Sequence, residues 1–446
     1  MDIKLLPEIY RSKRNEKLSR GKMRELQKRS LSRLLTYAYE NSAYYRKSFT
    51  EAGITSENIL KLPLSAFPSI DKSILMDNFD SIVTERDLTQ RELAEFDKST
   101  DLTERLFKGK YHIVHSSGST GEPKYFAYDA RAWNAMLAGM IRAALWGMSI
   151  PQIIKFIAKR PRILYVAATD GRYGGAMAVG DGIQGCGAKQ MFLDVNTPLC
   201  EWIDRIQSFR PNMIVGYPSA VKIAAELACE GKISVNAERV VSCGEPLGAG
   251  LREYIHKAFG AEVINFYGAS ESIALGVEDE RSNGMYLFDD MNLIEVENGN
   301  MYLTVLYNYA QPLIRYRLSD KLVLKSPDTR YPFTRSESIA GRDEDIMWFD
   351  DGRGGREFLH PLAVEGFCID GLLDYQFRKI SGSAFEILAE VSDGAKRERV
   401  KVELLKQVRM ILDKKRLSHI RFDVKFTDGI MPDPKTGKKA LVVRNA

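Results

Sequence analysis

Residues 213–268 read as strand, helix, strand, helix and strand, and this order sets the expected fold. In chain order the segments are MIVGY (213–217), SAVKIAAELACE (219–230), RVVSCG (239–244), LGAGLREYIHKAFG (247–260) and EVINFYG (262–268). A further apolar run, ILYVAA (163–168), precedes them. Short apolar strands that alternate with helices are typical of a parallel sheet covered by helices. Ligands bind at the carboxyl ends of such strands, so SCGEP (242–246) and FYGASES (266–272) are candidate binding motifs.

The regions around this core differ in pattern. The first hundred residues are expected to be mainly helical, because residues 31–53 carry apolar side chains at helical spacing until Gly53 ends the run. After about residue 285 the chain becomes β-rich, and Asn298-Gly299 between two alternating runs predicts a tight hairpin. We expect one large N-terminal domain, residues 1–340, with parallel sheets and a β-rich subdomain.

The last hundred residues predict a separate unit. Strands are expected near YQFRKI (375–380), AFEILAEV (384–391) and IRFDVKF (420–426), with one helix over about 396–416. This β-β-α-β order is typical of a small two-layer α+β domain. We place the hinge at GRDED (341–345) and the C-terminal domain at 346–446. The fold class is therefore α/β: a large α/β domain followed by a small mobile α+β domain.

Composition excludes several classes of protein. The chain has 446 residues, 44% hydrophobic and 28% charged, which describes an ordinary globular protein. It has no long apolar run, and its N-terminus carries charges where a signal peptide is apolar, so we expect no membrane span and a cytoplasmic location. A net charge of +5 is too small to indicate nucleic acid binding. The 5 cysteines and 5 histidines are scattered, so neither disulfides nor a zinc site is expected.

Basic residues concentrate between Arg11 and Arg33. A helix with such a face could lie on a membrane or bind an acidic partner. Its apolar side, however, resembles ordinary core docking, so we interpret the basic face as solvated.

The segment HSSGSTGEPK (115–124) is the strongest local indication of function. It combines two glycines, four hydroxyl side chains and a lysine between apolar segments. Backbone N–H groups and hydroxyls in such a loop can form a concave site for a polyphosphate, which favours an ATP-using enzyme over a Ser/Gly-rich surface turn. A Walker A loop is excluded, because Glu122 and Pro123 separate Gly121 from Lys124.

Taken together, the motifs resemble the adenylate-forming superfamily, in the branch of the phenylacetate–CoA ligases and coenzyme F390 synthetases. The resemblance covers nearly the whole chain. It rests on these strings, in order: YENSAYYRKSFTEAGI (39–54), LPLSAFPSIDKSIL (62–75), HSSGSTGEPK (115–124), YGGAMAVGDG (173–182), VSCGEPLGAGLRE (241–253), NFYGASES (265–272), IRYRLSD (314–320), GRDED (341–345) and PKTGKK (434–439).

The resemblance implies a reaction in two steps. A carboxylate attacks the α-phosphate of ATP to give an acyl-adenylate and pyrophosphate, and a second nucleophile then takes the acyl group. Two anions must meet in the first step, so cations and preorganised donors are needed. Glu271 would hold Mg²⁺. The remaining phosphate-binding residues implied are Ser116, Ser117, Gly118, Ser119, Thr120, Gly121 and Lys124, with Thr120 also catalytic.

Further roles follow from the same resemblance. Gly244, Glu245 and Pro246 would lie against adenine, and Tyr267 would stack on it. Asp320 would accept hydrogen bonds from the ribose hydroxyls, and Arg342 would reach the nucleotide or hold the hinge at Glu344. Lys438, on the small domain, would bridge the substrate carboxylate and the α-phosphate when that domain closes.

The resemblance leaves the identity of the acid substrate and of the acyl acceptor more open than the nucleotide. The resemblance places Arg172, Tyr173, Gly174, Gly175 and Tyr217 around the acid, which we expect to be aromatic. Coenzyme A is the expected acceptor, but the segment after 345 departs from the family pattern, so an amine, a hydroxyl or a carrier protein stays open. A non-catalytic nucleotide-binding homologue is the alternative of another class, and relatives suggest a homodimer.

Overall fold

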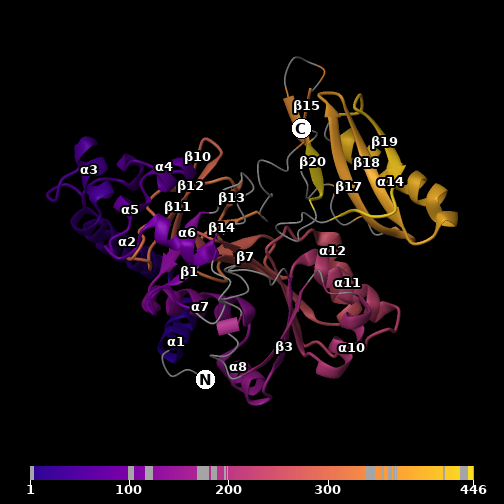
Figure 1. Cartoon of the computed structure of the whole chain (residues 1–446), viewed down its shortest axis with the longest axis horizontal. Helices are drawn as coiled ribbons and strands as arrows, with labels where there is room; N and C mark the ends of the chain where they lie inside the picture. Colours follow the sequence, from indigo (N-terminus) through magenta and orange to yellow (C-terminus); the bar gives the residue numbers. More distant parts are fainter. Residues whose placement is uncertain are drawn as a thin grey trace.

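The computed structural model describes residues 5–98, 105–115, 124–167, 180–181, 188–194, 197, 199–337, 347–350, 352, 356–359, 364, 367, 369–414, 417–431 and 440–444. Figure 1 shows a large N-terminal body and a smaller C-terminal sheet with one helix, coloured orange to yellow, above α11 and α12. Among the described residues, none of the helices combines the length and the apolar character that a membrane span requires.

One large mixed sheet forms the centre of the N-terminal body. Its strands β4, β3, β5, β6 and β7 run parallel, and β8, β9, β14 and β13 continue it antiparallel. In spatial order the strands are β13 (Leu324–Lys325), β14 (Arg335–Ser336), β9 (Met285–Leu287), β8 (Ser272–Glu278), β7 (Glu262–Ala269), β6 (Arg239–Cys243), β5 (Met213–Gly216), β3 (Arg162–Ala167) and β4 (Lys189–Asp194). The parallel sheet expected from 163–268 is thus confirmed. The strand β4 and the antiparallel extension were not predicted.

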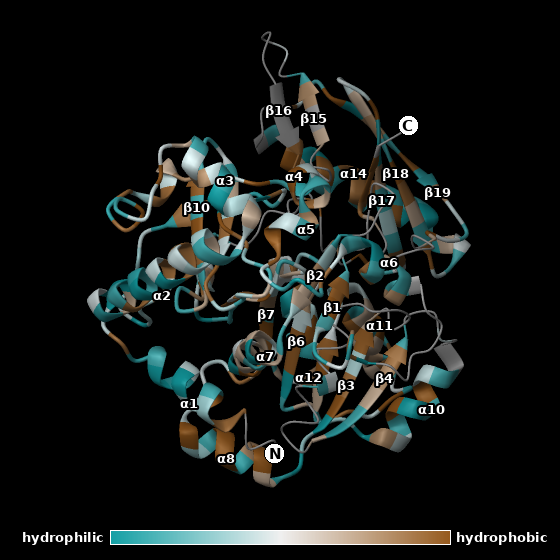
Figure 2. Cartoon of the chain, turned by 60° about the vertical axis from the view of Figure 1, so that its left-hand side comes forward, coloured by the Kyte–Doolittle hydropathy of each residue, from teal (hydrophilic) through white to brown (hydrophobic). Residues whose placement is uncertain are grey.

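Helices cover the apolar faces of these strands. They are α7 (Ala130–Ala144), α8 (Ile150–Ala158), α10 (Leu199–Phe209), α11 (Pro218–Cys229) and α12 (Ala249–Phe259). The strands are mostly brown in Figure 2, and buried side chains from strands and helices form one core cluster. A Cβ atom at Gly216 would lie 2.2 Å from the Val166 carbonyl oxygen, so β5 and β3 need glycine here to approach.

The N-terminal region is helical, as expected, but divided differently. Its elements are α1 (Leu6–Asn15), α2 (Arg20–Asn41), α3 (Ala43–Glu51), η1 (Leu64–Ala66), α4 (Lys72–Asp77), α5 (Phe79–Ile82) and α6 (Gln90–Lys98). The predicted helix over 31–53 breaks at Ser42, whose backbone is extended and whose hydroxyl accepts a hydrogen bond from the Tyr45 N–H. That hydroxyl also donates to the Ser81 carbonyl, so a contact distant in sequence helps to fix the break. Gly53, with φ of +72°, ends α3 as expected.

The basic segment is not uniformly solvated. Lys13 is buried, and its ammonium forms an ion pair with Glu16 at 2.7 Å. Burial lowers the pKa of Lys13 and raises that of Glu16, in each case against the attraction of the partner. The interpretation as a solvated face is therefore wrong for Lys13, because α1 packs against α7.

A β-rich part joins the sheet to the helical region. It contains a three-stranded sheet in the order β10 (Asn292–Glu297), β11 (Asn300–Val305) and β12 (Tyr316–Leu318). It also contains the antiparallel pair of β1 (His112–His115) and β2 (Tyr125–Tyr128). Asn298 and Gly299 both have positive φ, 52° and 75°, which confirms the predicted tight turn. The strands β1 and β2 flank residues 116–123.

The C-terminal part has its own hydrophobic core. It contains β15 (Met347–Asp350), β16 (Arg356–Leu359), β17 (Leu372–Ser381), β18 (Ala384–Val391), η3 (Gly394–Lys396), α14 (Arg397–Lys414), β19 (Arg421–Phe426) and β20 (Val442–Arg444). The order β19-β18-β17-β20 confirms the predicted strands and helix and adds β20 beside β17. The hinge residues 341–345 lie outside the described ranges, so the proposed division at that point stays a prediction.

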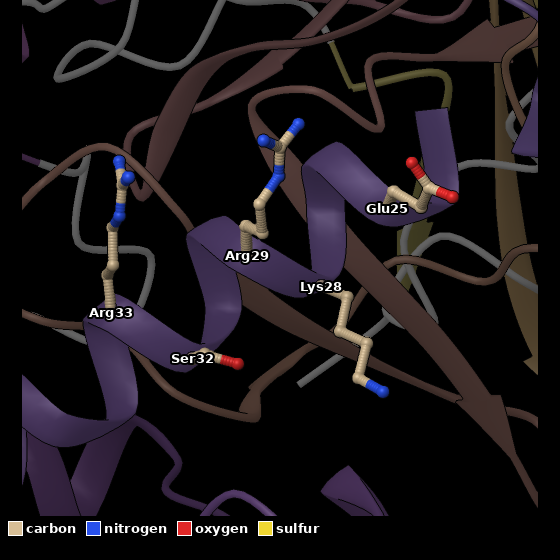
Figure 3. A pocket seen from close by; sticks show the side chains of 5 residues that line it. All are labelled: Glu25, Lys28, Arg29, Ser32 and Arg33. Carbon is tan, nitrogen blue, oxygen red and sulfur yellow. The ribbon is translucent and has the colours of Figure 1, made fainter. Parts of the chain in front are cut away.

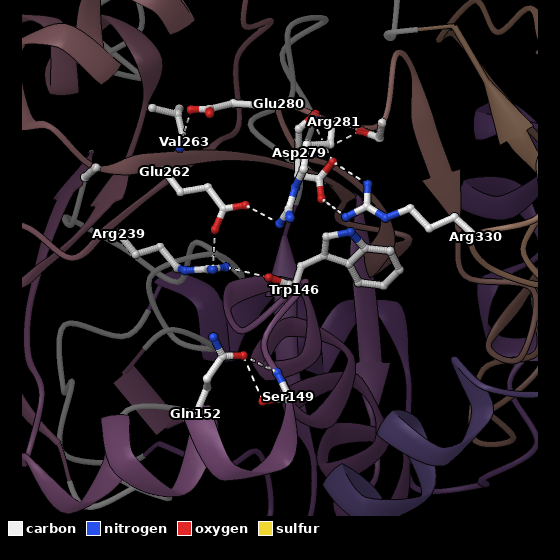
Figure 4. Close-up of polar contacts among 12 residues, drawn as sticks. Trp146, Ser149, Gln152, Arg239, Glu262, Val263, Asp279, Glu280, Arg281 and Arg330 are labelled. Atoms are coloured by element: carbon white, nitrogen blue, oxygen red, sulfur yellow. Dashed lines mark hydrogen bonds and ion pairs between the residues drawn. The ribbon is translucent and has the colours of Figure 1, made fainter.

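The amino ends of the parallel strands carry a polar network that stabilises the fold (Figure 4). Arg239, at the start of β6, donates to the Trp146 carbonyl at 2.8 Å and to Glu262 at 2.5 Å. Nearby, Arg330 binds both oxygens of the fully buried Asp279, at 3.1 and 2.7 Å. These charges are paired with each other, which leaves the opposite, carboxyl edge as the place for a ligand.

Candidate functional site

Lys124, Glu271 and Tyr316 meet at the carboxyl edge of the sheet. The Lys124 ammonium lies 2.9 Å from a Glu271 carboxylate oxygen and donates to the Tyr316 hydroxyl at 3.2 Å. Lys124 precedes β2, Glu271 lies in the turn between β7 and β8, and Tyr316 begins β12. Three segments that are far apart in sequence thus converge on one buried carboxylate, which is 5% exposed.

Both described residues that flank 116–123 approach the turn between β7 and β8. On one side, Ser270 Oγ donates to the His115 carbonyl at 3.5 Å, and on the other Lys124 pairs with Glu271. The Tyr128 hydroxyl supports the same turn, with the Ser270 and Glu271 carbonyls at 3.0 and 3.1 Å. The described residues at both ends of the predicted phosphate loop are therefore tied to the turn that carries Glu271, the residue predicted to hold the metal.

A second contact joins the same elements. The Tyr267 hydroxyl donates to Asp320 Oδ2 at 2.6 Å, which links the end of β7 to the segment after β12. The turn between β7 and β8 is tight, since a Cβ atom at Gly268 would lie 2.1 Å from the Ile273 carbonyl oxygen. Two residues predicted to bind the nucleoside are thus brought together beside the Lys124 cluster.

The adenine motif lies at the end of β6. Gly244 has φ of +80°, a conformation that favours glycine, so the chain turns sharply there. The Glu245 carboxylate accepts hydrogen bonds from the backbone N–H and the hydroxyl of Ser219, each at 3.1 Å. Glu245 therefore ties the end of β6 to the start of α11, a role that the sequence did not indicate. Pro246 follows it and is partly buried.

Tyr217, predicted for the acid pocket, follows β5 and is buried. Its N–H donates to the Val166 carbonyl at 3.1 Å. Tyr165 in β3 is buried close to Tyr217 and Cys243, and its pKa is raised well above the usual value, mainly by burial. This side of the site is apolar and aromatic.

Burial and the negative charge of Glu271 raise the pKa of Tyr316, so its hydroxyl keeps its proton. That hydroxyl accepts a hydrogen bond from the Lys124 ammonium, which in turn pairs with Glu271. Across the described residues, no group of three or more His, Cys, Asp or Glu side chains could hold a metal ion. One carboxylate beside a phosphate loop nevertheless fits Mg²⁺, which prefers one or two carboxylates together with substrate phosphates.

Several predicted site residues lie outside the described ranges. They are Ser116, Ser117, Gly118, Ser119, Thr120, Gly121, Arg172, Tyr173, Gly174, Gly175, Arg342, Glu344 and Lys438. Conversely, sequence reasoning missed Tyr316 and Ser219. Tyr316 could have been suspected, because it lies within the IRYRLSD string, four residues before Asp320.

A hollow of about 520 Å³ lies elsewhere, along one side of α2 (Figure 3). Its lining residues are Glu25, Lys28, Arg29, Ser32 and Arg33. All come from one helix, and none is a predicted site residue. It is therefore a feature separate from the site described above.

Comparisons with known proteins agree with this geometry. The AMP-binding enzyme family model matches residues 69–292, half of the chain. Phenylacetate–coenzyme A ligase of Escherichia coli (strain K12) is 28% identical over 373 residues, 78% of this chain and 77% of that protein. Indoleacetate–lysine synthetase of Pseudomonas savastanoi is 30% identical over 145 residues, 31% of this chain and 36% of that protein.

A solved structure extends the likeness to the whole fold. It is 2-hydroxyisobutyryl-CoA ligase in the postadenylation state, with a TM-score of 0.73 and 19% identity over 97% of this chain and 91% of that one. The fold, the converging motifs and the family match lead to one conclusion: the chain belongs to the AMP-binding enzyme family of adenylate-forming ligases, in the branch of the phenylacetate–CoA ligases.

Proposed function

We propose that this enzyme activates an aromatic carboxylic acid with ATP and transfers the acyl group to coenzyme A. An oxygen of the acid attacks the α-phosphorus, pyrophosphate leaves, and the acyl-adenylate forms. The thiol sulfur then attacks the acyl carbon, its proton is lost, and AMP leaves. The observation that carries the proposal is the convergence of Lys124, Glu271, Tyr267 and Asp320 at one edge of the sheet.

The chain's own residues divide the binding of ATP between them. Lys124 would neutralise negative charge on the phosphates, and the Asp320 carboxylate would accept hydrogen bonds from the ribose hydroxyls. Glu271 would hold Mg²⁺, which neutralises charge on the phosphate oxygens when bound. Lys438 would join the site from the C-terminal part, and the hinge at Glu344 would allow that part to close.

The aromatic acid is supported by two observations. The relatives with the longest matches are named phenylacetate–coenzyme A ligases, and two buried tyrosines, Tyr165 and Tyr217, lie on the side of the sheet where the acid is expected. Aromatic rings favour aromatic partners through stacked or edge-to-face contacts.

An amine acceptor is the second candidate. The similarity to indoleacetate–lysine synthetase favours it, because that protein's name specifies an acyl transfer to lysine. The first half of the reaction would be unchanged, and the amine would replace the thiol in the second.

The test is acid-dependent exchange of pyrophosphate into ATP over a panel of aryl and alkyl acids, followed by AMP release on addition of coenzyme A or lysine. We expect exchange with aryl acids and AMP release with coenzyme A. Release with lysine alone would replace the thioester by an amide. Absence of exchange with every acid, under conditions where ATP binds, would leave the non-catalytic alternative.

A pair of matched variants checks that the exchange comes from this site. Glu271→Gln should lower exchange at least about 100-fold, since it removes the charge that would hold the metal. Glu253→Gln changes an exposed glutamate on α12 that pairs with Lys257 of the same helix, and should leave exchange unchanged.

A further inference from the structure

Tyr316 and Tyr128 are both buried beside the turn between β7 and β8, and their hydroxyls contact different groups. Tyr316 is 1% exposed, and its ring packs in the core between the helical region and β10–β12. The hydroxyl accepts a hydrogen bond from the Lys124 ammonium, which also pairs with the Glu271 carboxylate, and that carboxylate lies close enough to help raise the pKa of Tyr316. By contrast, the Tyr128 hydroxyl bonds to backbone carbonyls of the same turn.

The backbone holds Tyr316 in place from both sides. Tyr316 pairs with Leu303 in β11, and on its other side it forms a parallel bridge with Ile70. The Arg317 N–H donates to the Ile70 carbonyl at 2.8 Å, and the Ile70 N–H to the Arg315 carbonyl at 3.2 Å. The phenol therefore projects from a fixed point.

Arg315, the residue before Tyr316, is a second indication that the backbone is held firmly here. Arg315 has φ of +50°, a left-handed conformation that is costly for a residue with a side chain. Its guanidinium compensates through contacts with the Ser65 and Phe67 carbonyls, each at 2.9 Å, and with Glu295 and Glu297 at 3.2 and 2.7 Å. Strained backbone that is held so firmly tends to occur beside functional groups.

We propose that Tyr316 is a positioning residue: its hydroxyl orients the Glu271 carboxylate and the Lys124 ammonium together, and so sets the affinity of the site for the divalent cation that accompanies ATP. The inference rests on the proposed function. A carboxylate paired with an ammonium that a phenol holds in place presents its remaining oxygen lone pairs in one direction. Without the hydroxyl, Lys124 has one acceptor fewer, so its ammonium is held by the carboxylate alone and competes more strongly with the metal for it.

The test compares Tyr316→Phe with Tyr128→Phe in the full-length protein. Each change removes one buried hydroxyl beside the same turn and keeps the ring. With a non-hydrolysable ATP analogue, the dissociation constant of Mn²⁺ is measured by electron paramagnetic resonance, and thermal unfolding is recorded in parallel. Tyr316→Phe should weaken Mn²⁺ about 10-fold, as loss of groups that orient metal ligands usually does, while Tyr128→Phe changes it less than about 2-fold.

A double-mutant cycle with Lys124→Met supplies an independent measurement. If Tyr316 acts through the carboxylate and ammonium as one unit, the double variant should bind Mn²⁺ no more weakly than the weaker single variant. The cycle stays informative if Tyr316→Phe also lowers the melting temperature. Additive losses of Mn²⁺ affinity in the double variant would mean that Tyr316 and Lys124 act separately, which would contradict the positioning role.

The outcomes separate this inference from the proposed function. Equal losses in both Tyr→Phe variants, or none in either, would overturn the positioning role while acid-dependent exchange still stood. Failure of the unmodified protein to bind Mn²⁺ with the ATP analogue would overturn it together with the metal role of Glu271. Failure of acid-dependent exchange despite normal Mn²⁺ binding would count against the proposed function alone.

Discussion

At the scale of single residues, the site consists of a cluster and a pair. Lys124 contacts both Glu271 and Tyr316, and Tyr267 contacts Asp320. Glu271 and Tyr267 lie at or near the turn after β7, while Tyr316 and Asp320 lie in and just after β12. The two strand ends are thus linked by charged or polar contacts on the side where the nucleotide is proposed to bind.

Asp320→Asn should weaken ATP binding selectively. The variant keeps the shape of the side chain but replaces one carboxylate oxygen by an amide that donates, so a ribose hydroxyl loses a charged acceptor. We expect the KM for ATP in the exchange reaction to rise about 10-fold, the effect of one charge-assisted hydrogen bond, with little change in kcat. Asp328→Asn is the matched control, since Asp328 accepts from Tyr286 in a similar pair away from β12. An equal rise of KM in both variants would contradict a specific role for Asp320.

At the scale of elements, buried charges fix how the N-terminal helices attach to the sheet. Arg142 in α7 is fully buried and binds both oxygens of Asp290 at 2.8 and 3.1 Å, with its guanidinium carbon 3.8 Å from the centre of the Phe288 ring. Asn15 in α1 donates to the same aspartate at 2.9 Å. One carboxylate between β9 and β10 thus holds both α1 and α7.

Arg142→Ala should strongly destabilise the N-terminal part. It leaves the Asp290 carboxylate buried without its main counter-charge, which typically costs about 3–5 kcal/mol. Urea unfolding followed by tryptophan fluorescence measures the change. The control is Arg205→Ala in α10, which removes an exposed pair with Glu201 at 2.8 Å and should cost under about 1 kcal/mol. Similar losses for the two variants would mean that burial of the Arg142 pair has little effect on stability.

At the scale of the whole molecule, the proposed reaction needs the C-terminal part to supply Lys438. Ala440, two residues after Lys438 in the sequence, is attached to the C-terminal sheet: Gln376 in β17 donates to the Ala440 carbonyl at 2.9 Å, and β20 pairs with β17. Lys222 in α11 donates to the Leu373 carbonyl at 3.2 Å, so the C-terminal sheet also touches the body near the carboxyl edge of β5.

Lys438→Ala should abolish adenylate formation but leave ATP binding nearly intact. Because the lysine is proposed to bridge the acid and the α-phosphate, exchange should fall at least about 100-fold, as when a preorganised charge is removed from a transition state. ATP binding, measured by equilibrium fluorescence, should stay nearly intact. Lys439→Ala provides the neighbouring charge as control. Exchange that persists in Lys438→Ala but is lost in Lys439→Ala would move the role to Lys439.

The sequence by itself determined the local elements and the identity of the site motifs. The parallel strands, the Asn298-Gly299 hairpin and the C-terminal β-β-α-β unit follow from periodicity and turn chemistry, which depend on neighbouring residues only. The proposed roles of Lys124, Glu271, Tyr267 and Asp320 come from motif resemblance, and the structure adds that Lys124 contacts Glu271 and Tyr267 contacts Asp320.

Only the tertiary structure decided which of these residues are in contact, and where the structure departs from what the local sequence pattern predicts. The helix breaks at Ser42 because its hydroxyl reaches Ser81, and Lys13 is buried because α1 packs on α7. Lys124 meets Glu271 and Tyr316, and Glu245 meets Ser219, because segments distant in sequence pack together at the carboxyl edge of the large sheet. Such contacts depend on how strands and helices pack against each other, and no local pattern of residues encodes that.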